Sequence, residues 1–161
     1  MQTAILLLGS NLGDRAENLG NAISKLESKI GRIIRVSSVY ESEPWGMRSD
    51  SNFYNQCVSL STSLNPSDLL KRIHTIEQEM GRIEVTQKYM DRIIDVDILF
   101  YGDREISLGD LTVPHPRIRK RRFALIPLLE IYPDFVFPAT SEKLHDILDS
   151  CKDKLSVRKL P

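Results

Sequence analysis

The sequence predicts an α+β fold in which two helices pack on one face of an antiparallel β-sheet. Segments with the apolar spacing of amphipathic helices alternate with short apolar or alternating segments typical of strands. Their order is β-α-β-β-α-β, which builds a two-layer sandwich rather than a parallel sheet. The 161 residues, of which 41% are hydrophobic, suffice for one domain with a core but not for two. No linker or repeat divides the chain, so we expect a single domain over residues 1–161.

The first half of the pattern begins with a continuous apolar run, Thr3 to Leu8, typical of a central strand. After a glycine-containing turn comes a helix, whose start carries the capping-box pair Asp14 and Glu17 and whose end is marked by Gly31. The buried stripe of this helix is predicted to be Ala16, Leu19, Ile23, Leu26 and Ile30. The segment Ile33 to Tyr40 is rich in branched residues and predicts the second strand.

The second half begins with a polar, irregular segment, Glu41 to Asn52, followed by a predicted third strand, Phe53 to Ser63. Asn65 and Pro66 are typical of an N-cap and a first helical residue, and they start the second helix. Its buried stripe is predicted to be Leu69, Ile73, Ile76 and Met80. A second polar loop, Arg82 to Asp91, leads to the fourth strand. Polar loops of this length are more often functional than simple connectors.

This order corresponds to the ferredoxin-like arrangement, with both helices on one face of the sheet and the second face left open. In this topology the fourth strand pairs beside the first, near the centre of the sheet. A C-terminal helical extension follows. It is predicted to contain an apolar helical stretch broken by Pro127 and a short helix from Ser141, with Leu144, Ile147 and Leu148 facing inward.

The fourth strand, RIIDVDILFYG from Arg92 to Gly102, is the most informative segment for function. Asp95 and Asp97 share a face because alternate residues of a strand do so, and their Cα atoms should lie about 6.5–7 Å apart. The opposite, core face is predicted to consist of Ile94, Val96, Ile98 and Phe100. Two close carboxylates repel unless a cation lies between them, and Mg²⁺ favours such ligands together with substrate phosphates. A half-exposed strand with solvated acids is the alternative.

Cations elsewhere in the chain favour a phosphate ligand. Arg82 and Arg92 bracket the second polar loop. A basic cluster follows later and consists of Arg117, Arg119, Lys120, Arg121 and Arg122. Guanidinium groups beside acids and a metal suit a polyphosphate, although a solvated basic surface is the alternative for each arginine. His115 lies between two prolines, outside regular structure, whereas His74 and His145 lie on helices and are predicted to be surface residues.

Two residues of the loop and third strand suit a planar heterocycle. Trp45, the only tryptophan, lies in a polar loop, where it either folds back on the core or stacks on a ligand. Asn55 can donate and accept hydrogen bonds together, and a polar residue at a strand edge is the alternative. The segment GSNLGDR at residues 9–15 contains two glycines but lacks the spacing of a Walker phosphate loop. A tight turn that caps the following helix explains these residues.

Eight segments together resemble the 6-hydroxymethyl-7,8-dihydropterin pyrophosphokinase family of folate biosynthesis in order and spacing. They are GSNLGDR (9–15), SVYESEPWG (38–46), FYNQ (53–56), Ile76-Glu77, Gly81-Arg82, DRIIDVDILFYG (91–102), LTVPHP (111–116) and RRF (121–123). The resemblance covers nearly the whole chain. The D-x-D-I-L strand with its upstream arginine and the L-T-V-P-H motif are together specific, and they favour a metal site over solvated acids.

The resemblance implies transfer of pyrophosphate from ATP to the pterin hydroxymethyl group, with release of AMP. It implies two Mg²⁺ ions held by Asp95 and Asp97, and a pterin ring stacked between Trp45 and Phe123. The pterin-binding positions that it implies are Ser42, Glu43, Pro44, Trp45, Phe53, Asn55, Asp95 and Phe123. The implied ATP-binding positions are His74, Glu77, Arg82, Arg92, Ile98, Thr112, His115 and Arg121, with Arg82 and Arg92 as catalytic residues.

The chain departs from the family pattern in four places. Lys88 to Asp91 replaces an arginine–tryptophan–glycine–proline run, and Ser42 to Pro44 replaces threonine–proline–proline. Asp110 and Pro116 stand where some members have an arginine and a tyrosine near the adenine. These differences concern loop closure and adenine contacts, and they leave the metal pair and the pterin side intact.

Composition argues against several other classes of protein. With 22 basic and 22 acidic residues, no net field attracts nucleic acid or a membrane, and every apolar run is too short to span a bilayer. The start lacks the basic segment and cleavage site of a secretory signal. The two cysteines, Cys57 and Cys151, lack metal-ligand spacing and favour free thiols in a reducing compartment. We therefore expect a cytoplasmic monomer with small-molecule substrates.

Two other functions share the predicted fold. RNA-recognition modules have the same element order and stack bases on sheet aromatics. Here the first strand carries no aromatic residue, and the K/R-G-F/Y-G/A-F pattern is absent from the third. A regulatory small-molecule domain without catalysis is the third possibility, and a magnesium-dependent ATP site would distinguish the enzyme from both.

Overall fold

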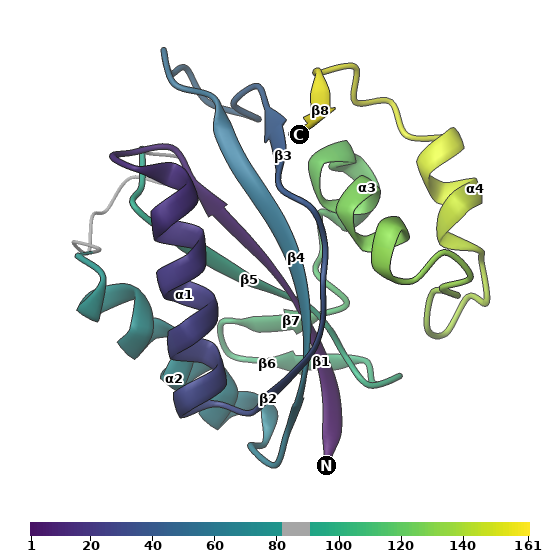
Figure 1. The fold of residues 1–161 in the computed structure, drawn as a ribbon. Coiled ribbons are helices and arrows are strands. Elements are labelled where there is room, and N and C mark those ends of the chain that lie inside the picture. The colour runs from purple at the N-terminus through teal and green to yellow at the C-terminus, as the bar shows by residue number, and fades with distance from the viewer. Residues whose placement is uncertain (82–90) are drawn as a thin grey trace.

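A computed structural model describes residues 1–81 and 91–161, and a six-stranded antiparallel sheet forms its centre (Figure 1). The strands of this sheet are β1 (Gln2–Ser10), β2 (Arg32–Val36), β3 (Tyr40–Ser42), β4 (Phe53–Thr62), β5 (Asp95–Tyr101) and β8 (Val157–Lys159). The strand order is β5-β1-β4-β3-β8, and β2 also pairs with β4. The helices are α1 (Arg15–Lys29), α2 (Pro66–Glu79), α3 (Arg122–Ile131) and α4 (Leu144–Asp149).

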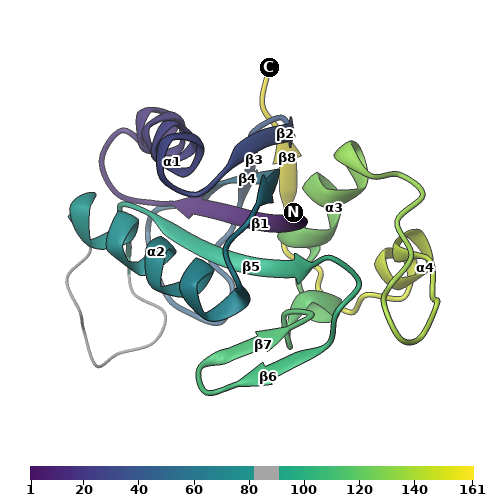
Figure 2. The same ribbon diagram turned by 90° about the horizontal axis from the view of Figure 1, so that it is seen from below.

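Helices α1 and α2 cover one face of the sheet, as the periodicity predicts (Figures 1 and 2). Their stripes bury Leu26 and Ile73 against Leu6 and Leu8 of β1, and all four side chains are inaccessible to solvent. Ala16, predicted for the buried stripe of α1, is exposed instead. Both predicted helix starts are confirmed. The carboxylate of Asp14 accepts the backbone N–H of Glu17 at 3.0 Å, and Asn65 likewise caps α2. The ferredoxin-like arrangement is therefore confirmed. Strand β5 pairs beside β1 as predicted, but it lies at the edge of the sheet, so the predicted position near the centre is wrong.

The second face of the sheet is covered, so the prediction of an open face is wrong. Helices α3 and α4 lie against it and bury a second core (Figure 2). Ile5 and Leu7 of β1 face this core, together with Phe100 and residues of the helices such as Leu125 and Leu144. The continuous apolar run of the first strand already indicated burial on both faces, because a strand with one solvated face alternates.

Strand β5 does not keep its alternation to the end. Ile5 pairs with Phe100 and Leu6 with Ile98, so Leu99 is an extra residue that forms a β-bulge. The bulge reverses the faces beyond it. Phe100 therefore lies in the second core, not in the core under α1 and α2 that the sequence predicted, and Tyr101 lies in that first core.

Other boundaries also differ from the prediction. The expected strand from residue 33 to residue 40 is two strands, β2 and β3, because Ser37 leaves the ladder and its hydroxyl oxygen accepts the N–H of Cys57. Helix α3 continues through Pro127, which does not break it, since packing of its apolar side chains against the sheet outweighs one missing hydrogen bond. Helix α4 begins at Leu144, three residues after Ser141, which has a positive φ of 59°.

A short hairpin, β6 (Ile106–Leu108) and β7 (Leu111–Val113), follows β5 and leads through the 3-10 turn η1 (Ile118–Lys120) into α3. No strand was predicted here from the sequence, although Gly109, which has a φ of 54° in the turn, is a signal for a hairpin. None of the helices in the described part of the chain has both the length and the apolar character that a membrane span requires.

Candidate active site

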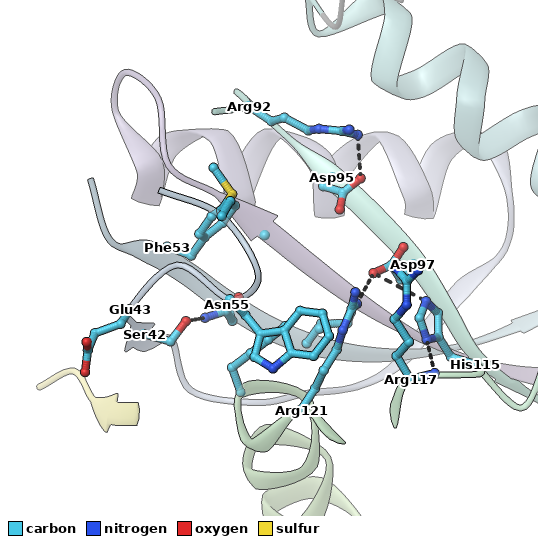
Figure 3. A pocket seen from close by; sticks show the side chains of 15 residues that line it. Ser42, Glu43, Phe53, Asn55, Arg92, Asp95, Asp97, His115, Arg117 and Arg121 are labelled. Carbon is cyan, nitrogen blue, oxygen red and sulfur yellow. Dashed lines mark hydrogen bonds and ion pairs between the residues drawn. The ribbon is translucent and has the colours of Figure 1, made fainter. Parts of the chain in front are cut away.

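Asp95 and Asp97 lie at the start of β5 and project from the face opposite the first core. Val96 and Ile98, which alternate with them, are buried in that core. The two carboxylates therefore share one side, as the alternation predicts, and their side chains are 34% and 29% exposed. Figure 3 shows both among the side chains that line one cavity.

Two cavities meet at this carboxylate pair. The first has a volume of about 260 Å³ and is lined by Leu7, Gly9, Ser42, Glu43, Trp45, Met47, Phe53, Asn55, Arg92, Asp95, Asp97, His115, Arg117, Arg121 and Phe123. The second, of about 250 Å³, is lined by Leu70, His74, Glu77, Asp95, Val96, Asp97, Ile98, Asp110, Leu111, Thr112, His115 and Pro116. Asp95, Asp97 and His115 belong to both, so a group held between them is reachable from either cavity.

The first cavity combines aromatic faces with buried polar groups from adjacent strands. The amide of Asn55 donates to the hydroxyl of Ser42 at 2.7 Å and to the carbonyl of Tyr40 at 3.4 Å, and both Asn55 and Ser42 are almost fully buried. Gly9 lies beside Phe53, where the absence of a side chain leaves space. Of the described residues predicted for the pterin, Pro44 alone does not line this cavity.

Arg121 lies close to two aromatic side chains of the first cavity. Its guanidinium carbon lies 4.7 Å from the centre of the Trp45 ring and 5.5 Å from that of Phe123. Its Nη1 donates to Asp97 at 3.4 Å, and the side chain is only 10% exposed. Within the described residues, its buried Nε has no hydrogen-bond partner. Although predicted for ATP, Arg121 thus lies on the side of the cavity predicted for the pterin.

Arg92 also lines the first cavity, and its Nη1 donates to Asp95 at 3.3 Å (Figure 3). Its backbone is held by Asn11, whose side-chain oxygen accepts the Arg92 N–H at 2.6 Å. In return, the Arg92 carbonyl accepts the N–H groups of Asn11 and Leu12. The turn after β1 therefore positions the residues that lead into β5 besides capping α1, a role that the sequence did not predict. Arg82 and residues 88–90 lie outside the described residues.

His115 is held as a neutral imidazole. The N–H of Arg117 donates to its Nδ1 at 3.1 Å, which places the ring proton on Nε2, 3.9 Å from an Asp97 oxygen. Burial lowers the pKa of His115 to about 4, with further lowering by the charges of Arg121 and Arg117 and a smaller opposing effect of Asp95. At neutral pH, His115 therefore offers an N–H donor and no positive charge.

The second cavity holds most of the remaining positions predicted for ATP. Glu77 is almost fully buried, and its carboxylate accepts the N–H of Val96 at 3.1 Å. Thr112 on the hairpin and His74 on α2 are exposed at this cavity, so the prediction of a surface position for His74 is confirmed. Asp110 and Pro116, where the chain departs from the family pattern, line it as well.

The predicted basic cluster is split between several environments, so it does not form one phosphate site. Arg117 and Arg121 line the first cavity. Arg119 instead pairs with Glu142 at 2.7 Å, and Arg122 donates to a backbone carbonyl of the C-terminal segment. Sequence reasoning also missed Met47 as a lining residue, although its place two residues after Trp45 was a signal.

The sequence of the chain matches one family model over residues 5–133, that of 7,8-dihydro-6-hydroxymethylpterin-pyrophosphokinase (HPPK). The chain belongs to this family. It is 44% identical over 146 residues to the 2-amino-4-hydroxy-6-hydroxymethyldihydropteridine pyrophosphokinase of Aquifex aeolicus, which covers 91% of this chain and 90% of the relative. It is 39% identical over 147 residues to the pyrophosphokinase of the same name from Synechocystis, over 91% and 74% of the two chains.

Longer proteins contain a similar region. The folic acid synthesis protein fol1 of Pneumocystis carinii is 38% identical over 152 residues, and the chain spans 20% of its length. A crystal structure of an HPPK-DHPS in complex with substrates has a TM-score of 0.74 at 18% identity, covering 92% of this chain and 43% of its own. A Plasmodium falciparum HPPK-DHPS with pteroate has a TM-score of 0.73 at 19% identity, over 92% and 42%.

Family membership makes the chain a pyrophosphokinase that transfers pyrophosphate in folate biosynthesis. The fold agrees, because the similar solved structures share it. The RNA-recognition alternative loses its basis, since the sheet face that such modules use for stacking bases is covered here by α3 and α4.

Proposed function

We propose that the chain transfers the pyrophosphoryl group of ATP to the hydroxymethyl group of 6-hydroxymethyl-7,8-dihydropterin and releases AMP, with Mg²⁺ as the metal ion. The observation that carries this proposal is the position of Asp95 and Asp97 at the boundary of two cavities of different chemistry. One cavity suits a planar acceptor and the other a nucleotide, so the phosphates would cross the boundary between them.

The first cavity supports binding of the pterin. Trp45, Phe53 and Phe123 offer aromatic faces for a planar ring. Asn55 and Ser42 offer buried amide and hydroxyl groups, which can match the donors and acceptors along the edge of the heterocycle. A mainly apolar cavity with a few directed polar groups is the usual form of a small-molecule site.

The second cavity supports binding of ATP. Its lining includes Thr112, Glu77 and His74, and His115 at the boundary can donate Nε2–H to a phosphate oxygen. Arg92, held by Asn11, lies beside the carboxylates at the same boundary. Arg92 is placed to stabilise charge on the transferred group, whereas the role of Arg82 is proposed from the resemblance alone.

The carboxylate pair fits magnesium in its donor chemistry. Asp95 and Asp97 present hard oxygen donors on one face, both partly exposed to the cavities that substrate phosphates would enter. The nearby guanidinium groups of Arg92 and Arg121 partly offset the repulsion between the carboxylates. When bound, Mg²⁺ would neutralise developing charge on the phosphate oxygens.

The chemistry needs positioning more than a covalent side chain. The hydroxymethyl oxygen attacks the β-phosphorus of ATP in line with the departing oxygen of AMP. An oxygen–phosphorus bond forms to the pterin, the bond between the β-phosphorus and the oxygen retained by AMP breaks, and the hydroxyl proton passes to solvent. Neutral His115, with a pKa near 4, contributes a hydrogen bond rather than a base. Trp45 and Phe123 exclude water around the acceptor.

Product analysis tests this proposal directly. The chain is incubated with ATP, Mg²⁺ and 6-hydroxymethyl-7,8-dihydropterin, and the nucleotide products are separated. The proposal expects AMP and a pterin pyrophosphate in equal amounts, with no product when chelator removes Mg²⁺. A dihydropterin with a methyl group in place of the hydroxymethyl group is the control, because it lacks the attacking oxygen. Formation of ADP, or of AMP with the control compound, would contradict the proposed reaction.

A further inference from the structure

The C-terminal segment, residues 151–161, lies beyond the region that matches the family model, yet it bonds to residues on two walls of the first cavity or next to them. Strand β8 adds to the free edge of β3, and Figure 3 shows it next to Glu43, one of the cavity residues. The part of the segment before β8 runs past the start of α3, which carries the opposite wall. The segment therefore connects two walls that are far apart in sequence.

The first anchor of the segment is at the start of α3. The carboxylate of Asp153 accepts the backbone N–H of Arg122 at 3.2 Å, and the guanidinium of Arg122 donates to the carbonyl of Leu155 at 3.1 Å. Helix α3 has no side-chain cap of its own, so Asp153 satisfies one of its free N–H groups and complements the helix dipole. Arg121 and Phe123, on either side of Arg122, line the cavity.

The second anchor is along β3, on the other wall. The N–H of Ser156 donates to the Glu43 carboxylate at 2.9 Å, and the N–H of Glu43 donates to the Ser156 carbonyl at 3.3 Å. Next in register, Val157 pairs with Ser42, and the guanidinium of Arg158 donates to Glu41 at 2.8 Å. These bonds hold the last residues before the loop that carries Trp45.

We infer that the C-terminal segment is a brace that sets the separation of the two aromatic walls, and that Asp153 and the backbone of Ser156 are positioning groups for the planar acceptor. The inference rests on the proposed function, because the first cavity is the proposed pterin side. Stacking on two faces requires both walls at a defined spacing, and β3 has only three residues with which to hold its end of the loop. Residues 151–161 line neither cavity, but the wall residues beside their anchors, Glu43 and Phe123, line the first cavity and not the second.

A matched pair of substitutions at one position tests the brace. Ser156→Pro removes the N–H that bonds to Glu43, whereas Ser156→Ala keeps both backbone groups. Asp153→Ala removes the other anchor independently. For each variant, the Michaelis constants for pterin and ATP are measured, and pterin affinity is measured separately by the fluorescence of Trp45, the only tryptophan. The unfolding midpoint reports whether the fold survives.

The brace predicts that Ser156→Pro and Asp153→Ala raise the Michaelis constant and the dissociation constant for pterin by about tenfold, with ATP values within about twofold. Ser156→Ala should resemble the wild type. Unchanged pterin constants in both disrupted variants would overturn the inference, as would equal losses for pterin and ATP. A wild-type chain without turnover would instead refute the proposed reaction, while the fluorescence titrations would still decide whether the brace controls pterin binding.

Discussion

Arg121 lies against the rings of both Trp45 and Phe123, on which the pterin is proposed to stack, so Arg121 and the pterin should compete for these aromatic faces. Its guanidinium is planar, like the pterin, and lies 4.7 Å and 5.5 Å from the two ring centres. Arg121→Ala removes this group without touching the aromatic walls. We expect the variant to bind pterin more tightly than the wild type when no nucleotide is present, although its turnover falls because a cation near the phosphates is lost.

The expected gain in pterin affinity equals the energy of the Arg121 contacts that the pterin must displace in the wild type and need not displace in Arg121→Ala. A cation–π contact contributes about 0.5–2 kcal/mol, with larger values for desolvated groups, and the Arg121 side chain is 10% exposed. The bond from Nη1 to Asp97 is long, at 3.4 Å, so we assign it little energy. Displacement of about 0.5–2 kcal/mol corresponds to an affinity gain of about 2- to 30-fold.

The assay is titration of the nucleotide-free protein with 6-hydroxymethyl-7,8-dihydropterin, followed by Trp45 fluorescence and checked by calorimetry. Phe123→Ala is the comparison variant, and its pterin affinity should change in the opposite direction. Loss of a stacked aromatic face should weaken pterin binding by about 1–3 kcal/mol. If Arg121→Ala weakens nucleotide-free pterin binding as much as Phe123→Ala does, the competition is refuted and Arg121 contacts the pterin directly.

Three further predictions concern the metal, the packing and the pH dependence. Asp97→Asn should lower turnover by about 100-fold or more and raise the Mg²⁺ requirement with the fold retained, which activity and circular dichroism measure. Gly31→Ala should lower the free energy of unfolding by about 2 kcal/mol or more in denaturant titrations, because the added Cβ would overlap a carbonyl oxygen of β4. Gly20 lies on α1 in open space, so Gly20→Ala should raise the free energy of unfolding slightly. Burial and the hydrogen bond to Glu130 raise the pKa of Tyr40 in the folded protein to about 12, whereas tyrosine in the unfolded chain loses its proton near pH 10. The free energy of unfolding should therefore fall between pH 10 and pH 12. Tyr40→Phe should make this fall smaller.

The features that the sequence predicted correctly depend on neighbours close in the chain. Alternation alone places Asp95 and Asp97 on one face, because successive side chains of a strand point to opposite sides. Asp14 and Asn65 bond to N–H groups three residues away, so they specify where α1 and α2 begin. The element order then determined the arrangement of the sheet and two of its helices.

What the sequence could not determine depends on contacts between distant segments. The bulge at Leu99 arises from register with β1, and it moves Phe100 to the other core. The sequence does not distinguish the three arginines at positions 117, 119 and 121. In the structure, the path of η1 into α3 directs Arg117 and Arg121 to the first cavity, whereas Arg119 pairs with Glu142.

The tertiary structure also decided how the site is held. Asn11 forms a hydrogen bond with Arg92, which is 81 residues away in the sequence, and Ser156 forms one with Glu43, which is 113 residues away. No local pattern encodes such pairs, because side-chain and backbone groups become neighbours only after the sheet has assembled. The sequence by itself predicted which residues would carry the chemistry. The fold decided that two carboxylates stand between two cavities, since strand pairing and helix packing alone set the separation of their walls.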